Sequence, residues 1–286
     1  MKGEHPIRLL CDLLSVSPSG YYGSRQKRPS ARQREDAAIA AQIAAAHRAS
    51  RGTYGAPRIV VDLREEGTRT SKRRCARLMR DQGLRGKKKH RRRPRTTDSR
   101  HAQPVAANLL AERPAPSGPN QSWLTDITYL ETAEGWLYLA AILDLWSRKI
   151  VGWACGSTLH ASLVLEALGD ALKRRRPPKG LLHHSDRGSQ YVDDDYIAAL
   201  KAAGFERSMS RAGNCYDNAA MESFWASMKS DTGLDNSIPA SRGHAKLAVF
   251  DYIETFYNPT RRHSSLGQIS PVAFEKQHQL NDIKAA

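Results

Sequence analysis

Residues 123–157 read WLTDITYLETAEGWLYLAAILDLWSRKIVGWACGS, and three apolar segments within this stretch decide the fold. The segments at 123–130, 136–145 and 149–157 have the length and the aromatic and β-branched content of strands. Only a few residues connect them, which favours an antiparallel meander, because parallel strands need a crossover of a dozen residues or more. The stretch therefore predicts three consecutive strands of one sheet.

Strands and helices alternate after this meander. Two short apolar segments, 180–184 and 205–209, predict further strands. Helical patterning with start and stop signals predicts helices at 161–174, 193–203, 219–229 and 242–257. The order β-β-β-α-β-α-β-α-α is that of an α/β fold in which helices flank a mixed sheet.

The residues that precede this region differ from it in charge. Residues 1–116 contain 27 of the 45 Lys and Arg residues but only 10 of the 29 Asp and Glu residues. The sharpest block is 85–95, where eight of eleven residues are basic, and prolines punctuate the chain shortly after it. The sequence therefore predicts three regions. They are a basic helical region at 1–100, a Pro-rich linker at 101–119 and an α/β core with C-terminal helices at 120–286.

The basic region contains a helix-turn-helix pattern near 53–84. Short helices are predicted at 57–66 and 71–82, joined by a Gly-Thr-Arg-Thr turn, and the second helix is strongly basic. A helical hairpin with a charged outer face has the same pattern, but the adjoining basic block favours a nucleic-acid partner, because clustered cations bind phosphates. The candidate DNA-binding residues are Lys72, Arg73, Arg74, Arg77, Lys87, Lys88, Lys89, Arg91, Arg92 and Arg93.

Several classes of protein are excluded by the sequence. It has no run of 18 apolar residues that could span a bilayer, and its N-terminus lacks the pattern of a signal peptide. The four cysteines form no CxxC pair, which argues against a zinc site or a disulfide framework and fits a reducing cytoplasm. It also lacks a GxxxxGK[ST] phosphate loop. We therefore expect a cytoplasmic protein without a membrane partner.

Three carboxylates of the α/β region have positions that suggest chemistry. Asp126 lies in the middle of the first strand, Asp186 ends the fourth strand, and Glu222 lies one turn into a largely apolar helix. These elements can converge, and three converging carboxylates repel one another unless divalent cations neutralise them. Oxygen ligands favour Mg²⁺ or Mn²⁺. With two ions, one would activate a water or a 3′-hydroxyl and the other would stabilise the departing oxygen of a phosphodiester.

Other polar or aromatic residues of this region are expected to be structural. Adjacent residues of a strand point to opposite faces, so His183 and His184 are expected to pack or to lie near DNA rather than to ligate a metal together. Asp144 is expected to organise the turn after the second strand. Phe224 and Trp225 are expected in the core.

The motifs around the three carboxylates resemble the catalytic core of bacterial insertion-sequence transposases of the second-frame (OrfB) type, which are related to retroviral integrases. These motifs are WLTDITY at 123–129, HSDRGSQY at 184–191 and NAAMESFWASMK at 218–229. The spacing of 35 residues between the second Asp and the Glu is that of the family, and so is the lysine seven residues after the Glu.

Segments outside these motifs extend the resemblance. Residues 257–267, YNPTRRHSSLG, and 270–274, SPVAF, look like the C-terminal signature of the family, and 53–84 looks like its N-terminal helix-turn-helix. The resemblance implies an RNase H-like core with a DDE motif. By this resemblance, Asp126, Asp186 and Glu222 would be the catalytic residues and would bind two Mg²⁺ ions, for which Mn²⁺ would substitute. Lys229 would contact DNA nearby.

The resemblance also implies a reaction and partners. The enzyme would cut DNA at the terminal inverted repeats of its element and join the 3′ ends to target DNA, as a homo-oligomer associated with the nucleoid. The family commonly uses a first-frame (OrfA) protein, or a frameshift fusion with it. Two alternatives stay open: an RNase H-like nuclease without strand transfer, and a catalytically inactive DNA-binding relic for which Glu222 and metal are irrelevant.

Overall fold

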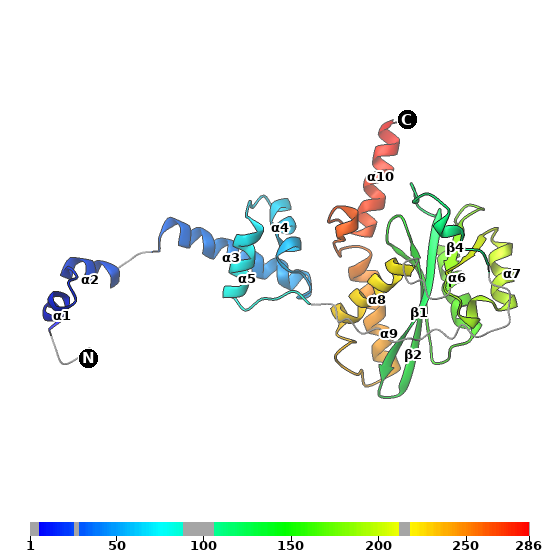
Figure 1. The fold of residues 1–286 in the computed structure, drawn as a ribbon, viewed down its shortest axis with the longest axis horizontal. Helices are drawn as coiled ribbons and strands as arrows, with labels where there is room; N and C mark the ends of the chain where they lie inside the picture. Colours follow the sequence, from blue (N-terminus) through cyan, green and yellow to red (C-terminus); the bar gives the residue numbers. More distant parts are fainter. Residues whose placement is uncertain (1–5, 26–28, 88–105, 212–217, 286) are drawn as a thin grey trace. The chain divides into compact units, whose positions relative to one another are not determined.

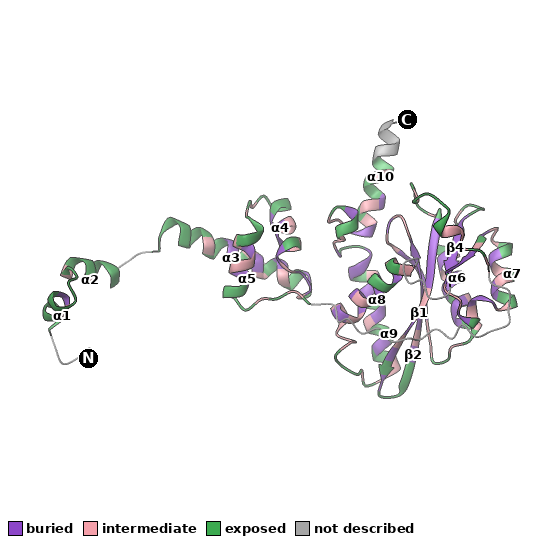
Figure 2. Cartoon of the chain, viewed as in Figure 1, coloured by how far each residue is buried: buried purple, intermediate pink, exposed green. Residues whose placement is uncertain are grey.

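The computed structural model describes residues 6–25, 29–87, 106–211 and 218–285, with side chains to residue 280 (Figure 1). The chain divides into two compact units, one ending at Gly86 and the other beginning at Lys87. Each unit has its own buried residues (Figure 2).

The N-terminal unit is helical. Its described elements are α1 (Ile7–Leu13), α2 (Pro18–Arg25), α3 (Ala31–Ala49), α4 (Ala56–Glu65) and α5 (Lys72–Asp81). Helices α3, α4 and α5 pack on one another around the fully buried Ile43, Ile59 and Leu63. The predicted helix-turn-helix is confirmed by α4 and α5.

Local signals explain where α4 and α5 begin and end. Pro57 lies in the first turn of α4, where its missing N–H breaks no helical hydrogen bond. The Ser71 side chain caps α5 by accepting a hydrogen bond from the Arg74 amide (3.1 Å). A Cβ on Gly86 would lie 2.6 Å from the Gly55 nitrogen. Only glycine therefore lets the chain after α5 pass so close to the start of α4.

The C-terminal unit is built on a five-stranded sheet with the order β3-β2-β1-β4-β5. Its strands are β1 (Ser122–Thr132), β2 (Gly135–Asp144), β3 (Ile150–Gly156), β4 (Leu182–Ser185) and β5 (Glu206–Met209). The first three strands form the predicted antiparallel meander, and β4 and β5 continue the sheet in parallel with β1. The mixed α/β sheet expected from the sequence is confirmed.

Helices cover both faces of this sheet (Figure 1). The covering helices are α6 (Ala161–Arg175), α7 (Asp194–Ala202), α8 (Ala219–Thr232) and α9 (Arg242–Phe250), whereas α10 (Pro271–Ala285) projects beyond the sheet. The main core lies between the sheet and α6 and α7, and it includes Trp123 and Ile142. On β3, a Cβ at Gly152 would lie 2.4 Å from the Ala167 carbonyl oxygen, so the glycine permits the close approach of α6. Helices α8 and α9 lie against the opposite face.

The C-terminal segment is anchored to the sheet by its polar residues. The predicted helix at 242–257 is α-helical only to Phe250 and continues as a π-helical turn over Asp251–Tyr257. The Asn258 amide group that follows donates to the Ile150 carbonyl and accepts from the Ile150 amide, both at 2.9 Å. This side chain therefore satisfies the free edge of β3 where the strand begins.

Residues 106–119, which belong to the expected linker, include a segment that contacts the sheet. The Met209 amide donates to the Ala107 carbonyl oxygen at 3.3 Å, and the Leu110 amide donates to Ser208 Oγ at the same distance. Residues 101–105 of the expected linker lie outside the described residues.

Candidate active site and nucleic-acid-binding residues

The strand register brings Asp126 and Asp186 together. In the parallel pairing of β1 with β4, Leu124 is opposite His184. Asp126 follows Leu124 by two residues, and Asp186 follows His184 by two residues. The parallel pairing therefore places the two aspartates side by side on adjacent segments of the sheet. The two carboxylates also interact electrostatically, because the charge of Asp186 contributes to a raised pKa at Asp126.

Three donors orient the carboxylate of Asp126, and one of them is the Asn218 side chain at the start of α8. The Ile127 amide donates to Oδ1 (2.8 Å), and the indole Nε1 of Trp225 on α8 donates to Oδ2 (2.9 Å). Burial, followed by the charge of Asp186, nevertheless raises the pKa of Asp126 to about 7. The position thus has more negative charge than its own hydrogen bonds compensate, and a divalent cation would remove this excess.

A tight turn orients Asp186 at the end of β4. The Gly188 amide donates to Asp186 Oδ1 (2.9 Å), and a Cβ on that glycine would lie 3.1 Å from the same oxygen. Arg187 Nε donates to the Ser210 carbonyl oxygen (2.9 Å), which ties the turn to the chain after β5. The residues that follow the aspartate therefore serve to aim its carboxylate.

Helix α8 lies beside these aspartates through two side chains. Trp225 reaches Asp126, and one turn further Lys229 Nζ donates to the Tyr129 carbonyl oxygen (2.9 Å). Burial lowers the pKa of Lys229, while the charge of Asp126 raises it. The lysine singled out by the sequence is thus part of the same region of the structure.

Glu222 lies on α8 near this region, and its side chain is exposed. It precedes Trp225 by three residues, so the two side chains project from neighbouring positions of one helix face. Within the described residues, no group of three or more His, Cys, Asp or Glu side chains is close enough to hold a metal ion. The structure therefore brings Asp126 and Asp186 together and leaves Glu222 outside their immediate contact.

The polar strand residues are structural, as expected. His184 Nδ1 and Nε2 lie 2.9 and 3.0 Å from the hydroxyl oxygens of Ser208 and Ser210. His183 is buried against Tyr196, and burial lowers its pKa to about 3. Both histidines are therefore packing residues. Asp144 accepts hydrogen bonds from the amides of Trp146 and Ser147 and from that of Asn120, which confirms its role in the turn.

Two of the candidate DNA-binding arginines are engaged within the N-terminal unit. Arg74 forms ion pairs with Glu35 (2.8 Å) and Asp36 (2.7 Å) of α3, and Arg77 pairs with Asp36 (2.6 Å) and Asp81 (3.2 Å). The sequence did not predict these partners, because nothing in it placed the acidic pair of α3 opposite α5. Arg74 and Arg77 thus hold α5 against α3.

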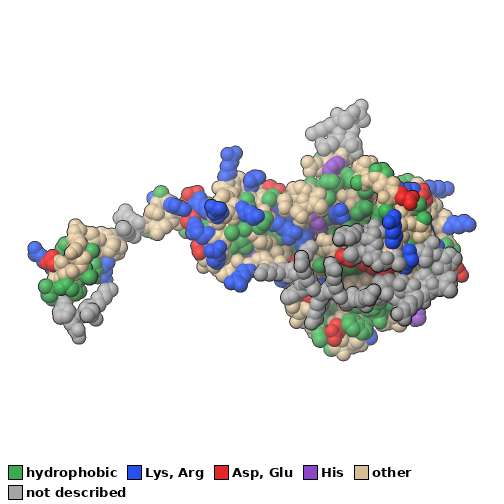
Figure 3. Space-filling model, viewed as in Figure 1, with side chains coloured by type: hydrophobic (Ala, Val, Ile, Leu, Met, Phe, Trp, Pro, Cys, Tyr) green, Lys and Arg blue, Asp and Glu red, His purple; other side chains and the backbone are tan. Residues whose placement is uncertain are grey.

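The other candidate cations are exposed where they are described. Lys72 and Arg73 lie in the first turn of α5, and Lys87 follows that helix. Figure 3 shows Lys and Arg side chains over the N-terminal helical unit. The remaining candidates, Lys88, Lys89, Arg91, Arg92 and Arg93, lie outside the described residues.

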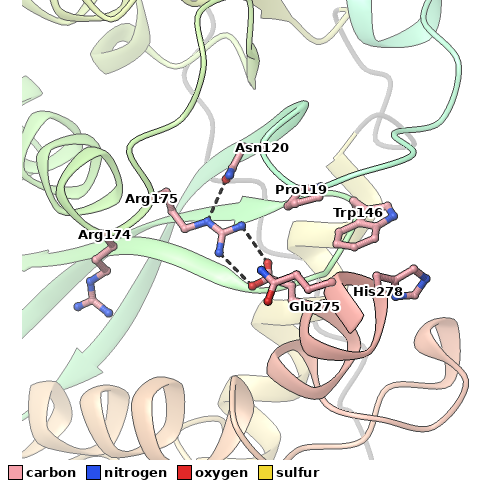
Figure 4. A pocket seen from close by; sticks show the side chains of 8 residues that line it. Pro119, Asn120, Trp146, Arg174, Arg175, Glu275 and His278 are labelled. Atoms are coloured by element: carbon pink, nitrogen blue, oxygen red, sulfur yellow. Dashed lines mark hydrogen bonds and ion pairs between the residues drawn. The ribbon is translucent and has the colours of Figure 1, made fainter. Parts of the chain in front are cut away.

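A separate surface pocket of about 270 Å³ lies beside α10 (Figure 4). Arg175 crosses it, donating twice to the Glu275 carboxylate at 3.0 Å and once to Asn120 Oδ1 at 2.9 Å. Trp146 and His278 complete its wall with their rings in contact. The sequence did not predict this cluster, whose polar groups bind one another and fasten α10 to the end of α6.

The sequence of the chain matches described families along most of its length. Residues 116–215 and 203–271 each match a family described as "Integrase core domain", and residues 33–93 match one described as "HTH-like domain".

No helix in the described part of the chain is both long and apolar enough to cross a membrane.

Similar proteins include curated relatives and solved structures. The "Insertion element IS600 uncharacterized 31 kDa protein" of Shigella sonnei is 47% identical over 272 residues, covering 95% of this chain and 99% of that protein. The "Transposase InsF for insertion sequence IS3A" of Escherichia coli (strain K12) is 42% identical over 279 residues, covering 97% and 96%. A solved HTLV-2 integrase catalytic core domain in complex with magnesium has a TM-score of 0.44 and 15% identity, covering 56% of this chain and 98% of that one.

These relatives match both units rather than the catalytic motifs alone. The helix-turn-helix and the integrase core thus occur in one chain that aligns with a known transposase over 97% of its residues. The family expected from the sequence is confirmed. The chain belongs to the insertion-sequence transposases, DDE polynucleotidyl transferases in which an RNase H-like integrase core follows a helix-turn-helix region.

Proposed function

We propose that Asp126, Asp186 and Glu222 are the catalytic carboxylates of this transposase and hold two Mg²⁺ ions, for which Mn²⁺ can substitute. The observation that carries the proposal is the placement of Asp126 next to Asp186 at the carboxyl end of β4. The atoms of these three side chains that can bind a metal are all carboxylate oxygens, and such ligands suit a hard divalent cation. When bound, the ions supply activation of the attacking hydroxyl and stabilisation of the leaving oxygen.

The side chains of this chain have separate tasks in the proposal. Asp126 and Asp186 bind the ions from two fixed positions, since backbone amides and Trp225 already orient their oxygens. Glu222 is exposed on α8 and turns toward the aspartates when metal and DNA bind. Lys229, held beside Tyr129 next to the site, contacts a phosphate of the bound DNA.

The proposed division of labour extends to the two ends of the chain. We assign terminal-repeat recognition to the basic region at 1–100, with the helix-turn-helix near 53–84, and chemistry to 120–286, with 101–119 between them. Lys72, Arg73 and Lys87 are exposed and suited to phosphates. The partners are the terminal inverted repeats and target DNA.

Joining two DNA ends in concert requires more than one active site, so we propose that the chain acts as a homo-oligomer on DNA. A first-frame (OrfA) protein, or a fusion with it, is a further partner in this proposal. Because the proposed substrate is chromosomal DNA, we expect the protein to be cytoplasmic and associated with the nucleoid.

The test uses labelled DNA that carries the end of the element, with Mg²⁺ and a target duplex. The wild-type chain is compared with Glu222→Gln, and both are assayed with and without the first-frame protein. Strand-joined product that disappears in Glu222→Gln supports the proposal. Nicking without joining under all conditions would favour a nuclease, and binding without Mg²⁺-dependent cleavage would favour an inactive relic.

A further inference from the structure

Trp225 links the middle of α8 to Asp126 through a direct hydrogen bond. Its indole Nε1 lies 2.9 Å from Asp126 Oδ2, while the Ile127 amide lies 2.8 Å from Oδ1. An ionised carboxylate has about four lone-pair sites on its two oxygens. The Asn218 side chain is a third donor, and the three hydrogen bonds still leave room on the carboxylate for a metal ion, so the indole orients the carboxylate without blocking it.

The surroundings of Trp225 explain why this hydrogen bond forms. The residue is 8% exposed, and its ring packs on Phe224 with 4.7 Å between the centroids. A buried indole N–H needs an acceptor, because leaving it without one is costly. The packed ring thus aims a donor at Asp126, and Lys229 secures the next turn of α8 against β1.

We propose that Trp225 is a positioning residue, whose indole N–H holds the Asp126 carboxylate in its metal-binding orientation and keeps α8, which carries Glu222, beside it. The inference rests on the proposed function, since it takes Asp126 to be a metal ligand. Partners that orient metal ligands in this way typically change metal affinity or activity by about 10- to 100-fold when removed.

The chain offers a matched control in Trp153 on β3. Its Nε1 donates to Glu254 Oε1 at 2.8 Å, so it also forms one indole hydrogen bond to a carboxylate. Glu254 lies in the π-helical turn and is not one of the proposed catalytic residues. Trp225→Phe and Trp153→Phe therefore remove the same group from an aromatic residue, at the site and away from it.

The experiment measures Mn²⁺ binding to the full chain from the electron paramagnetic resonance signal of free Mn²⁺, and the Mg²⁺ concentration that gives half-maximal cleavage. We expect Trp225→Phe to weaken Mn²⁺ binding about 10-fold and to raise the Mg²⁺ requirement similarly, with excess Mg²⁺ restoring cleavage. Trp153→Phe should stay within about twofold of wild type in both measurements, because its bond is not linked to a metal ligand.

Asp126→Asn separates the two possible failures. If it loses Mn²⁺ binding while Trp225→Phe binds as wild type does, the positioning role is wrong and the proposed site stands. If Asp126→Asn itself binds Mn²⁺ as wild type does, the proposed function fails.

If the Trp225→Phe variant does not fold, a measurement on the wild-type chain still tests the inference. The chain has five tryptophans, and their indole N–H resonances report on Mg²⁺ binding. We expect Mg²⁺ to shift the resonance of Trp225 in the wild type and to leave it in place in Asp126→Asn. An unmoved Trp225 resonance at saturating Mg²⁺ would overturn the inference.

Discussion

Two acidic pairs of this transposase, one in each unit, have opposite electrostatic surroundings. In the N-terminal unit, Glu35 and Asp36 face Arg74 and Arg77, and the hydrogen bonds from these arginines lower the pKa of both carboxyls. In the C-terminal unit, Asp126 faces Asp186, and burial together with the second charge raises its pKa to about 7. The first arrangement compensates charge, whereas the second concentrates it.

The difference separates structural acids from functional ones. A carboxylate that already faces a guanidinium has little to gain from a metal ion, whereas two adjacent carboxylates are stabilised when a cation arrives. Perturbed groups that natural packing leaves uncompensated are candidates for function for this reason.

The largest expected effect follows the loss of one member of the concentrated pair. Asp186→Asn should reduce cleavage and joining by a factor on the order of 10³ or more, because removal of a proposed metal ligand disables the whole constellation. Its folding stability should not fall in parallel, since the substitution removes repulsion at Asp126. Labelled-DNA cleavage and urea unfolding of the same preparation measure the two effects.

A second acid on α8 shows the compensated arrangement inside the catalytic unit. Asp231 is almost fully buried, accepts from Arg261 Nε and accepts from the Tyr252 hydroxyl (3.0 Å). Arg261→Ala leaves its charge buried without the guanidinium, which should cost about 3–5 kcal/mol of unfolding free energy. A loss below about 1 kcal/mol in urea unfolding would show that the two acids of this unit do not differ as argued.

The sequence predicted the features of the fold that depend on local patterns, and it did not predict those that depend on contacts between distant segments. The meander and the parallel strands were predictable, because apolar runs and short connections leave few ways to pair. Asp126 and Asp186 could be singled out because an ionised carboxylate in or next to an apolar strand is costly to bury unless a cation or hydrogen bonds compensate its charge. Their adjacency required the register of β1 with β4, which no local pattern specifies.

Features that depend on tertiary contacts were not predictable. Trp225 was expected in the core, and it is buried, but its hydrogen bond to Asp126 depends on how α8 crosses β1. The π-helical turn at 251–257 interrupts an apolar pattern that suited one continuous helix. Helix α2, PSGYYGSR, has two glycines and no helical apolar period, so its sequence gave no signal.

The concentrated pair should also give the metal-free chain a characteristic pH dependence. The folded-state pKa of Asp126 is raised from 3.8 to about 7, so between these values the folded chain retains a proton that the unfolded chain releases. The contribution of Asp126 to unfolding free energy therefore falls as pH rises through this window, by at most about 1.4 kcal/mol per pH unit.

Urea unfolding from pH 4 to pH 7 measures this contribution as the difference between wild type and Asp126→Asn. Mg²⁺ should flatten the wild-type curve, because it favours the ionised pair. Identical pH dependence in the two proteins would mean that burial and the charge of Asp186 do not raise the folded-state pKa of Asp126.

The smallest effects distinguish cations of one helix. Arg74→Ala should lower the thermal midpoint of the N-terminal unit, because it removes the ion pairs of α5 with Glu35 and Asp36. Lys72→Ala should leave that midpoint unchanged, since this exposed side chain contributes to no ion pair among the described residues. It should instead weaken DNA binding uniformly across sequences and reduce the logarithmic salt slope by about 1. If Arg74→Ala changes only the salt slope, its acidic partners release it to DNA, and the structural role assigned to the compensated pair is wrong.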